Sequence, residues 1–506
     1  MSVVYKTTGG SDEFAAARQQ LEFIVTRLQA EELRHAEHGE VEQFLHSDGM
    51  ELLRRLLQGH LDLRSRDEVR LDGVVGANDS ERTHVRRNCR RKLMTLFGEV
   101  MIFRHGYSAP GNSRLYPLDG ELNLPPDSYS DGLRRQVSES ASKNSFDDCV
   151  KEVEKASGGK VPKRQAQTLV RDVSQDFESF YRAREAVQRE ATTNPTDTIP
   201  LVLSVDGKGI VMRPSGLREG TRQAAEREAT NKRTRLSPGE KRNRKRMATV
   251  ATVYSVEKHQ RTAEQIMGRE DRTLPAPRAS NKRVWASLER DMSEVIDEQF
   301  REALVRDPDK LRPWIMLLDG NLHQLEIVKS MAKKHGVDVT VTVDFIHVLE
   351  YLWKAAHCLN AVGSNEAEQW VADRALSILQ GKASTVAAGM RRSATLRGRD
   401  KDARKAIDDC ANYLLKFRSY LRYDENLERG LPIATGVIEG ACRHLIKDRM
   451  DITGARWGLE GAEAVLKLRS LRSSGDFDEY WAAYKKRSLA RNHLSNYAEN
   501  RLPLAA

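Results

Sequence analysis

Apolar residues in the first part of the chain recur at the spacing of one helical face. Between residues 12 and 66 this period predicts helices with charged outer faces, which we expect to pack together or against a second subunit. The apolar set consists of Leu21, Phe23, Ile24, Leu28, Phe44, Met50, Leu52, Leu53, Leu56 and Leu57. From Lys92 to Tyr107 the residues alternate around Gly98 instead, which predicts a β-hairpin.

The helical period returns between Asp131 and Phe177, with a break typical of a helix-turn-helix. A helix is predicted over 146–156, a connector with two glycines follows, and a second helix is predicted over 162–173. Side chains that could reach phosphates and base edges gather on the second helix: Lys160, Lys163, Arg164, Gln165, Gln167 and Arg171. A plain helical hairpin without a DNA-binding role explains this segment equally well.

After a polar linker at 191–198 the pattern changes to strands. Strands are predicted at 199–209, 245–256 and 312–321, and a further strand over 337–353 continues into a helix. Two of these strands share an ending, because their apolar runs stop at Asp206-Gly207 and Asp319-Gly320, as buried strands do when they emerge at a sheet edge.

Only helices are predicted from Lys354 to Arg429, and this block has the character of an insertion. An amphipathic helix is predicted over 430–450, with Cys442 among its apolar residues and Glu439 on the opposite face.

Charge adds a candidate partner to this outline. The 506 residues carry a formal charge of +10, which suits a polyanion such as nucleic acid, although charge of this size can also serve solubility. Its distribution favours nucleic acid: the stretch from Arg213 to Arg246 holds twelve Lys or Arg and four Glu, a local excess of eight positive charges. This basic loop includes Arg242, Arg244 and Lys245.

Cysteine spacing and hydropathy exclude several classes of protein. The five cysteines lie far apart without a CxxC pair, which argues against a disulfide framework, a zinc ribbon and a redox dithiol. No long apolar run and no basic-then-apolar leader occurs, so we expect a cytoplasmic protein without a membrane partner.

Three acidic residues form the candidate active site. Asp206 and Asp319 at matched strand ends, with Glu439 from a later helix, could hold hard divalent cations, Mg²⁺ or Mn²⁺, in a two-ion site for phosphoryl transfer. Each has a plainer interpretation: an isolated Asp-Gly is a turn signal, and Glu439 with Arg443 could be a surface salt bridge. We expect Asp344 and His347, at the next strand-to-helix transition, to support the site without binding metal.

Four motifs resemble the transposases of bacterial insertion sequences, most of all the ISKra group. They are SVDGKG (204–209), LLDGN (317–321), VDFIHVLEYLW (343–353) and GVIEGACRHLIKDRMDITGARW (436–457). Asp344-x-x-His347 also resembles a signature of Mutator-like elements. The resemblance implies a ribonuclease-H-like core with Asp206, Asp319 and Glu439 as the Asp–Asp–Glu set, and an all-helical insertion domain. It further implies that water frees a 3′-hydroxyl at the element end, which then attacks target DNA.

Together these features predict an α/β catalytic core with a mixed sheet, joined to a mainly helical region for DNA binding and oligomerisation. The domains expected are 1–90 helical, 91–195 hairpin and helix-turn-helix-like, 196–350 with 430–475 catalytic, 351–429 helical insertion and 476–506 helical tail. Residues expected to contact DNA phosphates near the site are Lys208, Arg443, His444 and Lys447. Trp457 is expected to be structural.

Joining two ends of double-stranded DNA calls for at least a homodimer, and a bacterial transposase would associate with the nucleoid. Two alternatives stay open at this point: a structure-selective nuclease or resolvase of the same fold, and a DNA-binding regulator without catalysis.

Overall fold

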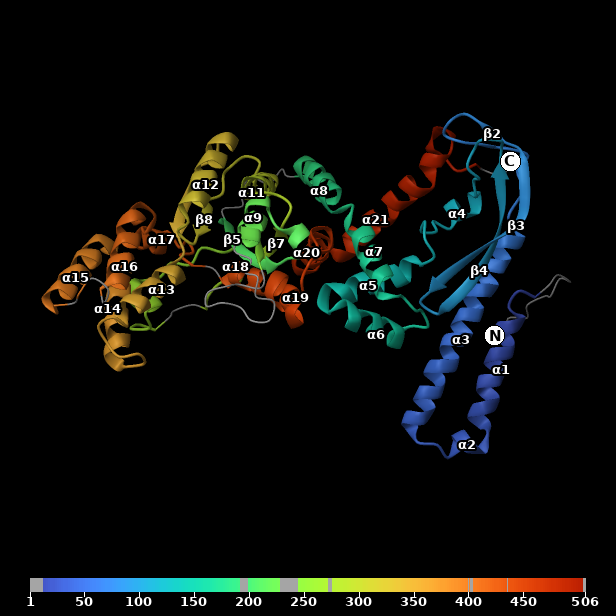
Figure 1. Ribbon diagram of the computed structural model, residues 1–506, viewed down its shortest axis with the longest axis horizontal. Coiled ribbons are helices and arrows are strands. Elements are labelled where there is room, and N and C mark those ends of the chain that lie inside the picture. The colour runs from blue at the N-terminus through green and yellow to red at the C-terminus, as the bar shows by residue number, and fades with distance from the viewer. Residues whose placement is uncertain are drawn as a thin grey trace. The chain divides into compact units, whose positions relative to one another are not determined.

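The structure is a computed structural model that describes residues 12–191, 199–227, 244–271, 275–398, 400, 404–434 and 436–503. The chain divides into two compact units, the first from residues 1–180 and 477–506 and the second from 181–476 (Figure 1). Within the described ranges, none of the helices combines the length and apolar character that crossing a bilayer requires. The linker 192–198 and most of the basic loop, including Arg242, lie outside these ranges.

The first unit begins with two antiparallel helices joined by a short one: α1 (Ala15–Gln29), α2 (Glu31–Arg34) and α3 (His38–Arg66). A capping box at Glu37 begins α3, because the Glu37 side chain and Glu40 each accept a backbone N–H of the other. Gln20 of α1 reaches Asp48 of α3 at 3.1 Å. The helices predicted from the period between residues 12 and 66 are confirmed, and they pack on one another.

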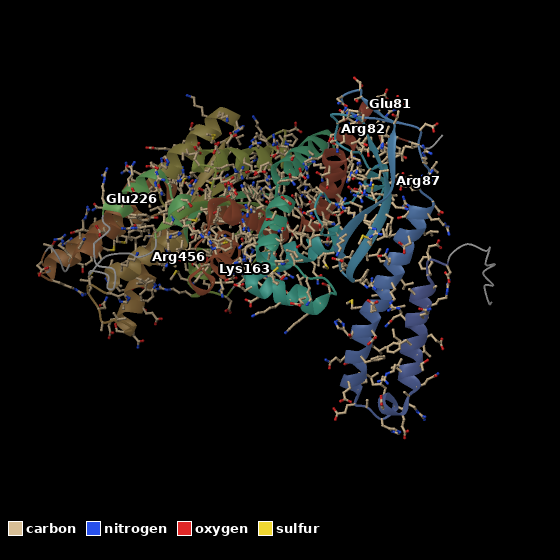
Figure 2. The ribbon with its side chains drawn as sticks, turned by 45° about the vertical axis from the view of Figure 1, so that its right-hand side comes forward. Glu81, Arg82, Arg87, Lys163, Glu226 and Arg456 are labelled. Atoms are coloured by element: carbon tan, nitrogen blue, oxygen red, sulfur yellow. The ribbon has the colours of Figure 1, made fainter. Side chains whose placement is uncertain are left out.

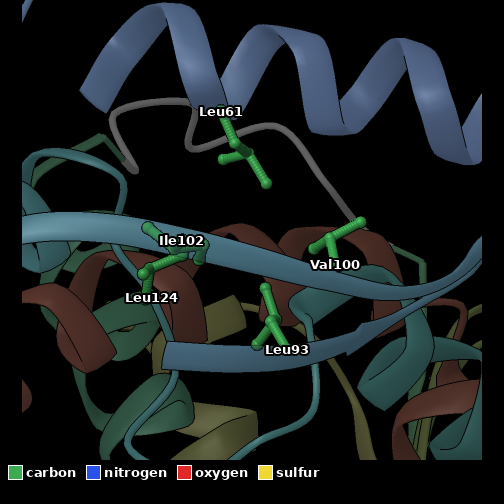
Figure 3. Packing of buried hydrophobic residues seen from close by; sticks show 5 residues of the cluster. All are labelled: Leu61, Leu93, Val100, Ile102 and Leu124. Carbon is green, nitrogen blue, oxygen red and sulfur yellow. The ribbon is translucent and has the colours of Figure 1, made fainter. Parts of the chain in front are cut away.

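A β-hairpin follows and packs against α3. Its strands are β3 (His84–Thr95) and β4 (Gly98–Ser108), so the predicted hairpin is confirmed and its first strand begins earlier than expected. Gly98 adopts φ +120° in the turn, a conformation open to glycine. Figure 3 shows Leu61 of α3 above Leu93, Val100, Ile102 and Leu124, which form the apolar core of this contact. The smaller elements here are β1 (Val74–Val75), β2 (Glu81–Arg82) and α4 (Pro117–Glu121).

Three mutually packed helices follow the hairpin: α5 (Asp131–Lys143), α6 (Phe146–Ala156) and α7 (Lys163–Ser174). The hydroxyls of Ser130 and Ser145 cap the first two, while Pro162 is the N-cap of α7 rather than its first residue. The predicted helix pair is therefore present with its connector. α8 (Phe177–Ala191) contains the boundary between the units, and α21 (Phe477–Asn492) with the 3₁₀ turns η5 (Leu494–Asn496) and η6 (Ala498–Asn500) completes the first unit.

The second unit contains a five-stranded mixed sheet. Its strands are β5 (Leu201–Val211), β6 (Lys245–Ser255), β7 (Ser280–Ser287), β8 (Trp314–Leu318) and β9 (Val339–Val343), in the order β7-β6-β5-β8-β9. β6 is antiparallel to β5 and β7, whereas β8 is parallel to β5 and β9. The expected α/β core with a mixed sheet is confirmed at this level. β7 was not predicted, because its first residues are polar and its buried centre contains Arg283.

Helices account for most of the rest of the second unit. They are α9 (Glu219–Arg227), α10 (Ala263–Ile266), α11 (Met292–Arg306), α12 (Leu322–His335), α13 (Phe345–Ala356), α14 (Asn365–Leu379), α15 (Ala383–Leu396), α16 (Lys405–Lys416), α17 (Tyr423–Glu428), α18 (Gly436–Ala441), α19 (Asp448–Met450) and α20 (Leu459–Ser474). The 3₁₀ turns are η1 (Pro214–Gly216), η2 (Arg418–Tyr420) and η4 (Ile452–Gly454). The all-helical prediction for 354–429 holds for the described residues there.

The predicted helix over 430–450 is interrupted. A π-helical segment, η3 (Cys442–Lys447), lies between α18 and α19. Such π turns inside a helix occur frequently at functional sites. The periodicity of apolar residues did not indicate this change of backbone geometry.

Candidate active site

Asp206 lies inside β5 and not at its end, which corrects the expectation from the apolar run. The strand continues to Val211 because β5 stays paired with β6, through Asp206↔Val250 as far as Val211↔Lys245. The pairing of β5 with β8 stops earlier, at Ser204↔Leu317. Asp206 is therefore placed just beyond the point where the neighbouring parallel strand ends.

The register of the parallel strands brings three aspartates to one level. β5 and β8 pair residues that are 113 positions apart, such as Leu201 with Trp314, and the same separation relates Asp206 to Asp319. β8 and β9 pair residues 25 positions apart, such as Trp314 with Val339, and this separation relates Asp319 to Asp344. Neighbouring strands lie about 4.7–4.9 Å apart. The three aspartates thus follow one another across adjacent strands.

Short hydrogen bonds orient each of these carboxylates. Asp206 accepts the N–H of Gly207 at 2.6 Å, Asp319 accepts the N–H of Asn321 at 3.0 Å, and Asp344 accepts the N–H of Ile346 at 2.8 Å. Asp344 is buried and is the N-cap of α13, and its own N–H donates to the carbonyl of Leu318 at 2.7 Å. Asp344 is therefore a structural part of the strand-to-helix transition.

Tyr413 of α16 forms a hydrogen bond to the loop that contains Asp319. Its hydroxyl donates to the carbonyl oxygen of Asp319 at 3.0 Å. Gly320 has φ +85°, and a Cβ atom at this position would lie 2.4 Å from the Tyr413 hydroxyl oxygen. The glycine of the LLDGN motif is thus required by both conformation and space. Sequence reasoning missed Tyr413, since nothing in its own segment distinguishes it from a core residue.

Cys442 is the second residue that sequence reasoning missed. Its thiol donates to the second oxygen of Asp206 at 3.1 Å, and its side chain is buried. Burial raises the pKa of Cys442, and the charge of Asp206 raises it further. The thiol therefore stays protonated near neutral pH and serves as a hydrogen-bond donor. The apolar pattern had assigned this cysteine to the core face alone.

Electrostatics link the first two aspartates. Burial raises the pKa of Asp319, the backbone N–H of Asn321 opposes that rise, and the charge of Asp206 adds to it. His347 acts in the opposite sense and lowers the pKa of Asp319. His347 itself is half-buried, with Nδ1 3.8 Å from Glu350. Two like charges near each other in a partly buried place can be neutralised by a bound cation.

Glu439 lies on α18, which contacts β5 and β6. Its side chain is exposed, and its charge contributes to the raised pKa of Cys442 three residues later. The alternative of a Glu439–Arg443 surface pair does not occur, since Arg443 lies 3.8 Å from Asp448. Within the described ranges, no group of three or more His, Cys, Asp or Glu side chains is gathered closely enough to hold a metal ion. The structure brings Asp206 and Asp319 together and leaves Glu439 nearby at the surface.

Basic side chains expected to contact DNA are exposed in both units. In the second unit Lys208 lies on β5 beyond Asp206, and its charge acts on Cys442. Arg443, His444 and Lys447 are exposed on the π-helical segment, and His444 lies 3.0 Å from Asp448. Lys245 is exposed at the first residue of β6, whereas Arg244, just before it, is half-buried.

In the first unit, Lys163 and Arg164 are exposed at the start of α7, and Figure 2 labels Lys163. Lys163 forms an ion pair with Asp147 at 2.6 Å.

Trp457 is a structural residue, as expected. Its indole N–H donates to the carbonyl of Met450 at 2.9 Å, and its backbone forms a bridge with Met212 just after β5. The guanidinium of Arg449 lies 4.8 Å from its ring centroid. The GARW motif therefore closes the helical segment of Glu439 against the end of the strand of Asp206.

No protein-family model and no curated protein matches this sequence. Among solved structures, the chain is similar to one in the Drosophila P element transposase strand transfer complex. The identity is 9%, the TM-score is 0.23, and the match covers 69% of this chain and 80% of that chain. A likeness of this extent assigns neither a fold nor an activity to this chain.

Proposed function

We propose that this chain is a DNA transposase that cuts and joins DNA by metal-dependent phosphoryl transfer at Asp206, Asp319 and Glu439. The observation that carries the proposal is the parallel register of β5 and β8, whose continuation by two residues relates Asp206 to Asp319, the residue just after β8. The strand order β7-β6-β5-β8-β9, with only β6 antiparallel to its neighbours, supports a ribonuclease-H-like core. The basic balance of the chain supports DNA as the substrate.

The donor chemistry of the site fits Mg²⁺ or Mn²⁺. Asp206 and Asp319 offer hard carboxylate oxygens, which such cations prefer, and their mutual repulsion favours a cation between them. Glu439 would complete the set by a rotation of its exposed side chain, which costs little at the surface. Two such ions, when bound, activate an attacking oxygen and stabilise a leaving oxygen. The Cys442 thiol and the Asn321 N–H would keep the two aspartates in orientation.

The proposed reaction has two displacements at phosphorus. In the first, water attacks a phosphodiester at the element end, and the 3′ oxygen leaves as a hydroxyl after taking up a proton. In the second, this 3′-hydroxyl loses its proton as it attacks a phosphodiester of the target DNA, and the 3′ oxygen of the target strand leaves as a hydroxyl after taking up a proton. Each step forms one P–O bond and breaks one, so no covalent protein–DNA intermediate is needed. Exposed Lys208 and Lys447 would neutralise DNA phosphates nearby.

We assign the joining of two copies to the helical hairpin α1–α3. Six large apolar side chains are exposed there: Leu21, Phe23, Val25, Leu45, Leu53 and Leu56. Along α3 the first half, 38–51, has four acidic residues and no Lys or Arg, whereas the second half, 52–66, has four arginines and one aspartate. Antiparallel pairing of two α3 helices would set the acidic half of each beside the basic half of the other.

Analytical ultracentrifugation at micromolar concentration of a Leu45→Glu/Leu56→Glu variant tests this pairing. The wild-type chain should be dimeric and the variant monomeric, because the substitutions put charges into the apolar interface. A matched Glu42→Gln variant should remain dimeric. A wild-type chain that is monomeric at micromolar concentration would contradict the assignment.

The catalytic proposal is tested by DNA cleavage. The substrate is the DNA that flanks this coding region, including any paired inverted repeats, with Mn²⁺ supplied. Asp206→Asn, Asp319→Asn and Glu439→Gln should each lower cleavage by about a thousandfold or more, because each removes a ligand of the reacting site. Asp338→Asn, an exposed aspartate just before β9, is the matched control and should cleave normally.

Three outcomes would overturn parts of the proposal. Full activity of one carboxylate variant would remove that residue from the site. Preferred cutting of four-way junctions over flanking DNA would favour a structure-selective nuclease. If the wild-type chain binds DNA but does not cleave it with any divalent metal, the chain would be better explained as a DNA-binding regulator.

A further inference from the structure

Three buried polar residues lie where the pairing of β5 with β8 ends. They are Ser204 of β5, Thr252 of β6 and Gln299 of α11, and each is 1% exposed or less. Ser204 and Thr252 are partners in the antiparallel ladder of β5 and β6. Ser204 with Leu317 is the last pair of the parallel ladder of β5 and β8. This level of the sheet is therefore the last one at which all three strands are paired.

Side-chain hydrogen bonds connect the three strands at this level. The amide nitrogen of Gln299 donates to the carbonyl oxygen of Ser204 at 2.9 Å and to that of Thr252 at 2.8 Å, so it connects β5 to β6. The Ser204 hydroxyl donates to the carbonyl oxygen of Leu317 at 3.0 Å and connects β5 to β8. Gln299 and Ser204 thus supplement the backbone pairing of the strands.

Packing of the core does not explain these polar side chains. Their neighbours along the two strands are apolar and buried: Leu203, Val205, Ala251 and Val253. Among the residues that the structure describes, Oε1 of Gln299 and Oγ1 of Thr252 have no hydrogen-bond partner. A buried polar atom without a partner costs free energy, and an apolar side chain of similar volume would avoid that cost. This cost indicates a role other than stabilising the core.

The two aspartates of the candidate site lie just beyond this level. Asp206 is two residues after Ser204. Asp319 is two residues after Leu317, so at about 3.3 Å per residue each carboxylate is roughly 7 Å beyond the last pair. The charge of Asp206 acts on Asp319, and like charges repel each other. β5 stays paired with β6 past Asp206, whereas β8 ends at Leu318, so repulsion acts to move the end of β8 away from β5.

We propose that Ser204 and Gln299 are positioning residues, which hold β6, β5 and β8 together so that Asp206 and Asp319 stay close enough to share cations. The inference rests on the proposed function, because it assumes that the two carboxylates act together. The Ser204 hydroxyl resists the separation of β8 from β5 directly, and Gln299 fixes the carbonyl group of Ser204 against β6. Both side chains are buried in the sheet, so they act only through the position of the aspartates.

A double-mutant cycle of melting temperatures tests the proposal without metal or DNA. At pH 8 in EDTA, Asp319→Asn removes the repulsion, so the melting temperature of the otherwise wild-type chain should rise by about 2–4 °C. In Ser204→Ala/Gln299→Met the strand ends can separate and relieve the repulsion. Adding Asp319→Asn to this background should therefore raise the melting temperature by less than about 1 °C.

The matched background for this cycle is Ser470→Ala. Ser470 of α20 is also a fully buried serine whose hydroxyl donates to a backbone carbonyl, that of Leu466 at 2.8 Å. Here Asp319→Asn should still raise the melting temperature by about 2–4 °C, because the β5–β8 contact is intact. Ser204→Ala alone removes a single oxygen atom and should give an intermediate rise. It takes the place of the double variant if that variant does not melt cooperatively.

A second arm measures the metal requirement of DNA cleavage. In Ser204→Ala/Gln299→Met the Mn²⁺ concentration for half-maximal cleavage should increase by about tenfold or more, because groups that orient metal ligands change metal affinity by such factors. In Ser470→Ala this concentration should not change. A purely structural role of the two residues would lower the fraction of active protein and leave the Mn²⁺ concentration for half-maximal cleavage as it is in the wild type.

Three results would overturn the inference. The first is an equal rise in melting temperature in the wild-type and double-variant backgrounds. The second is no rise in the wild-type background, since no repulsion would then have to be resisted. The third is an unchanged Mn²⁺ requirement in a double variant that cleaves DNA. A wild-type chain that does not cleave DNA counts against the transposase proposal instead, while the melting temperatures still test the role of Ser204 and Gln299.

Discussion

Buried carboxylates at the two ends of the central strands have pKa values that are shifted in opposite directions. Burial raises the pKa of Asp319, and Asp206 adds to the rise because it carries the same charge. Burial would likewise raise the pKa of Glu302, but Arg283 and Arg306 reverse the effect and hold it at about 2. Neighbouring charge, and not burial alone, thus decides whether a buried acid stabilises or opposes the fold. We place the proposed phosphoryl transfer at the strand ends near Asp206 and Asp319, where the negative charges are not balanced by a neighbouring arginine.

Removing the carboxylate of Glu302, which is balanced by arginines, should cause the largest loss of stability. Glu302→Gln would leave Arg306 without its carboxylate and Arg283 with Glu298 alone, so we expect the free energy of unfolding to fall by about 3 kcal/mol. Urea denaturation followed by circular dichroism measures this. Glu326→Gln, an exposed glutamate of α12, is the control and should change little.

The pH dependence of the same variant sharpens this prediction. Because the folded pKa of Glu302 is depressed below 4.5, its contribution is present above that value and is lost as the pH falls toward 2. The difference between the wild type and Glu302→Gln should therefore shrink in acid. A difference that stays constant from pH 7 to pH 3 would contradict it.

A change in the loop of Asp319 should have the next largest effect. Gly320→Ala combines a positive φ with a clash against the Tyr413 hydroxyl, so we expect a loss of roughly 2–3 kcal/mol and misplacement of Asp319. The melting temperature measures the loss. Gly389→Ala in α15 is the matched control: it meets no atom within 4 Å and should stabilise by about 0.5–1 kcal/mol. Equal effects of the two substitutions would contradict the role of Gly320.

Neutralising Asp319, whose charge is not balanced, should have a smaller effect and should stabilise the protein. Asp319→Asn removes a carboxylate whose ionised form is disfavoured in the fold, so the melting temperature at pH 8 in EDTA should rise by about 2–4 °C. The wild type regains this difference as the pH falls through the raised folded pKa toward 3.8, where protonation favours the folded state. Thermal melts at pH 8 and pH 4 test the sign. A destabilised variant at pH 8 would show that Asp319 is held by an attractive partner.

The thiol beside Asp206 should give the smallest effect. Cys442→Ala removes one donor to Asp206 and a small buried group, and we expect a loss of about 1 kcal/mol by urea denaturation. Cys442→Ser keeps a hydroxyl donor and should recover part of the DNA cleavage lost in the alanine variant. Identical cleavage rates in Cys442→Ala and the wild type would mean that the thiol does not position Asp206.

Local patterns indicated most of the elements that form the site. Buried strands are long apolar runs, so β5, β6, β8 and β9 could be predicted, and the connector after β9 could be placed by Asp344 and the helix that follows. Strand β7 could not be predicted in this way. Its central Arg283 is buried only because Glu298 and Glu302 of α11 neutralise it, and that compensation is not visible in the strand itself.

By itself, the sequence determined the two apolar runs that lead into Asp-Gly, the helical block before Glu439 and the excess of basic residues, since each follows from residues close together along the chain. The tertiary structure alone decided that β5 runs past Asp206, that Tyr413 and Cys442 reach Asp319 and Asp206, and that residues as distant as Arg184 and Asp476 line one cavity. The physical reason is that strand register and long-range side-chain contacts depend on packing between segments, which a local periodicity of hydrophobic residues does not encode.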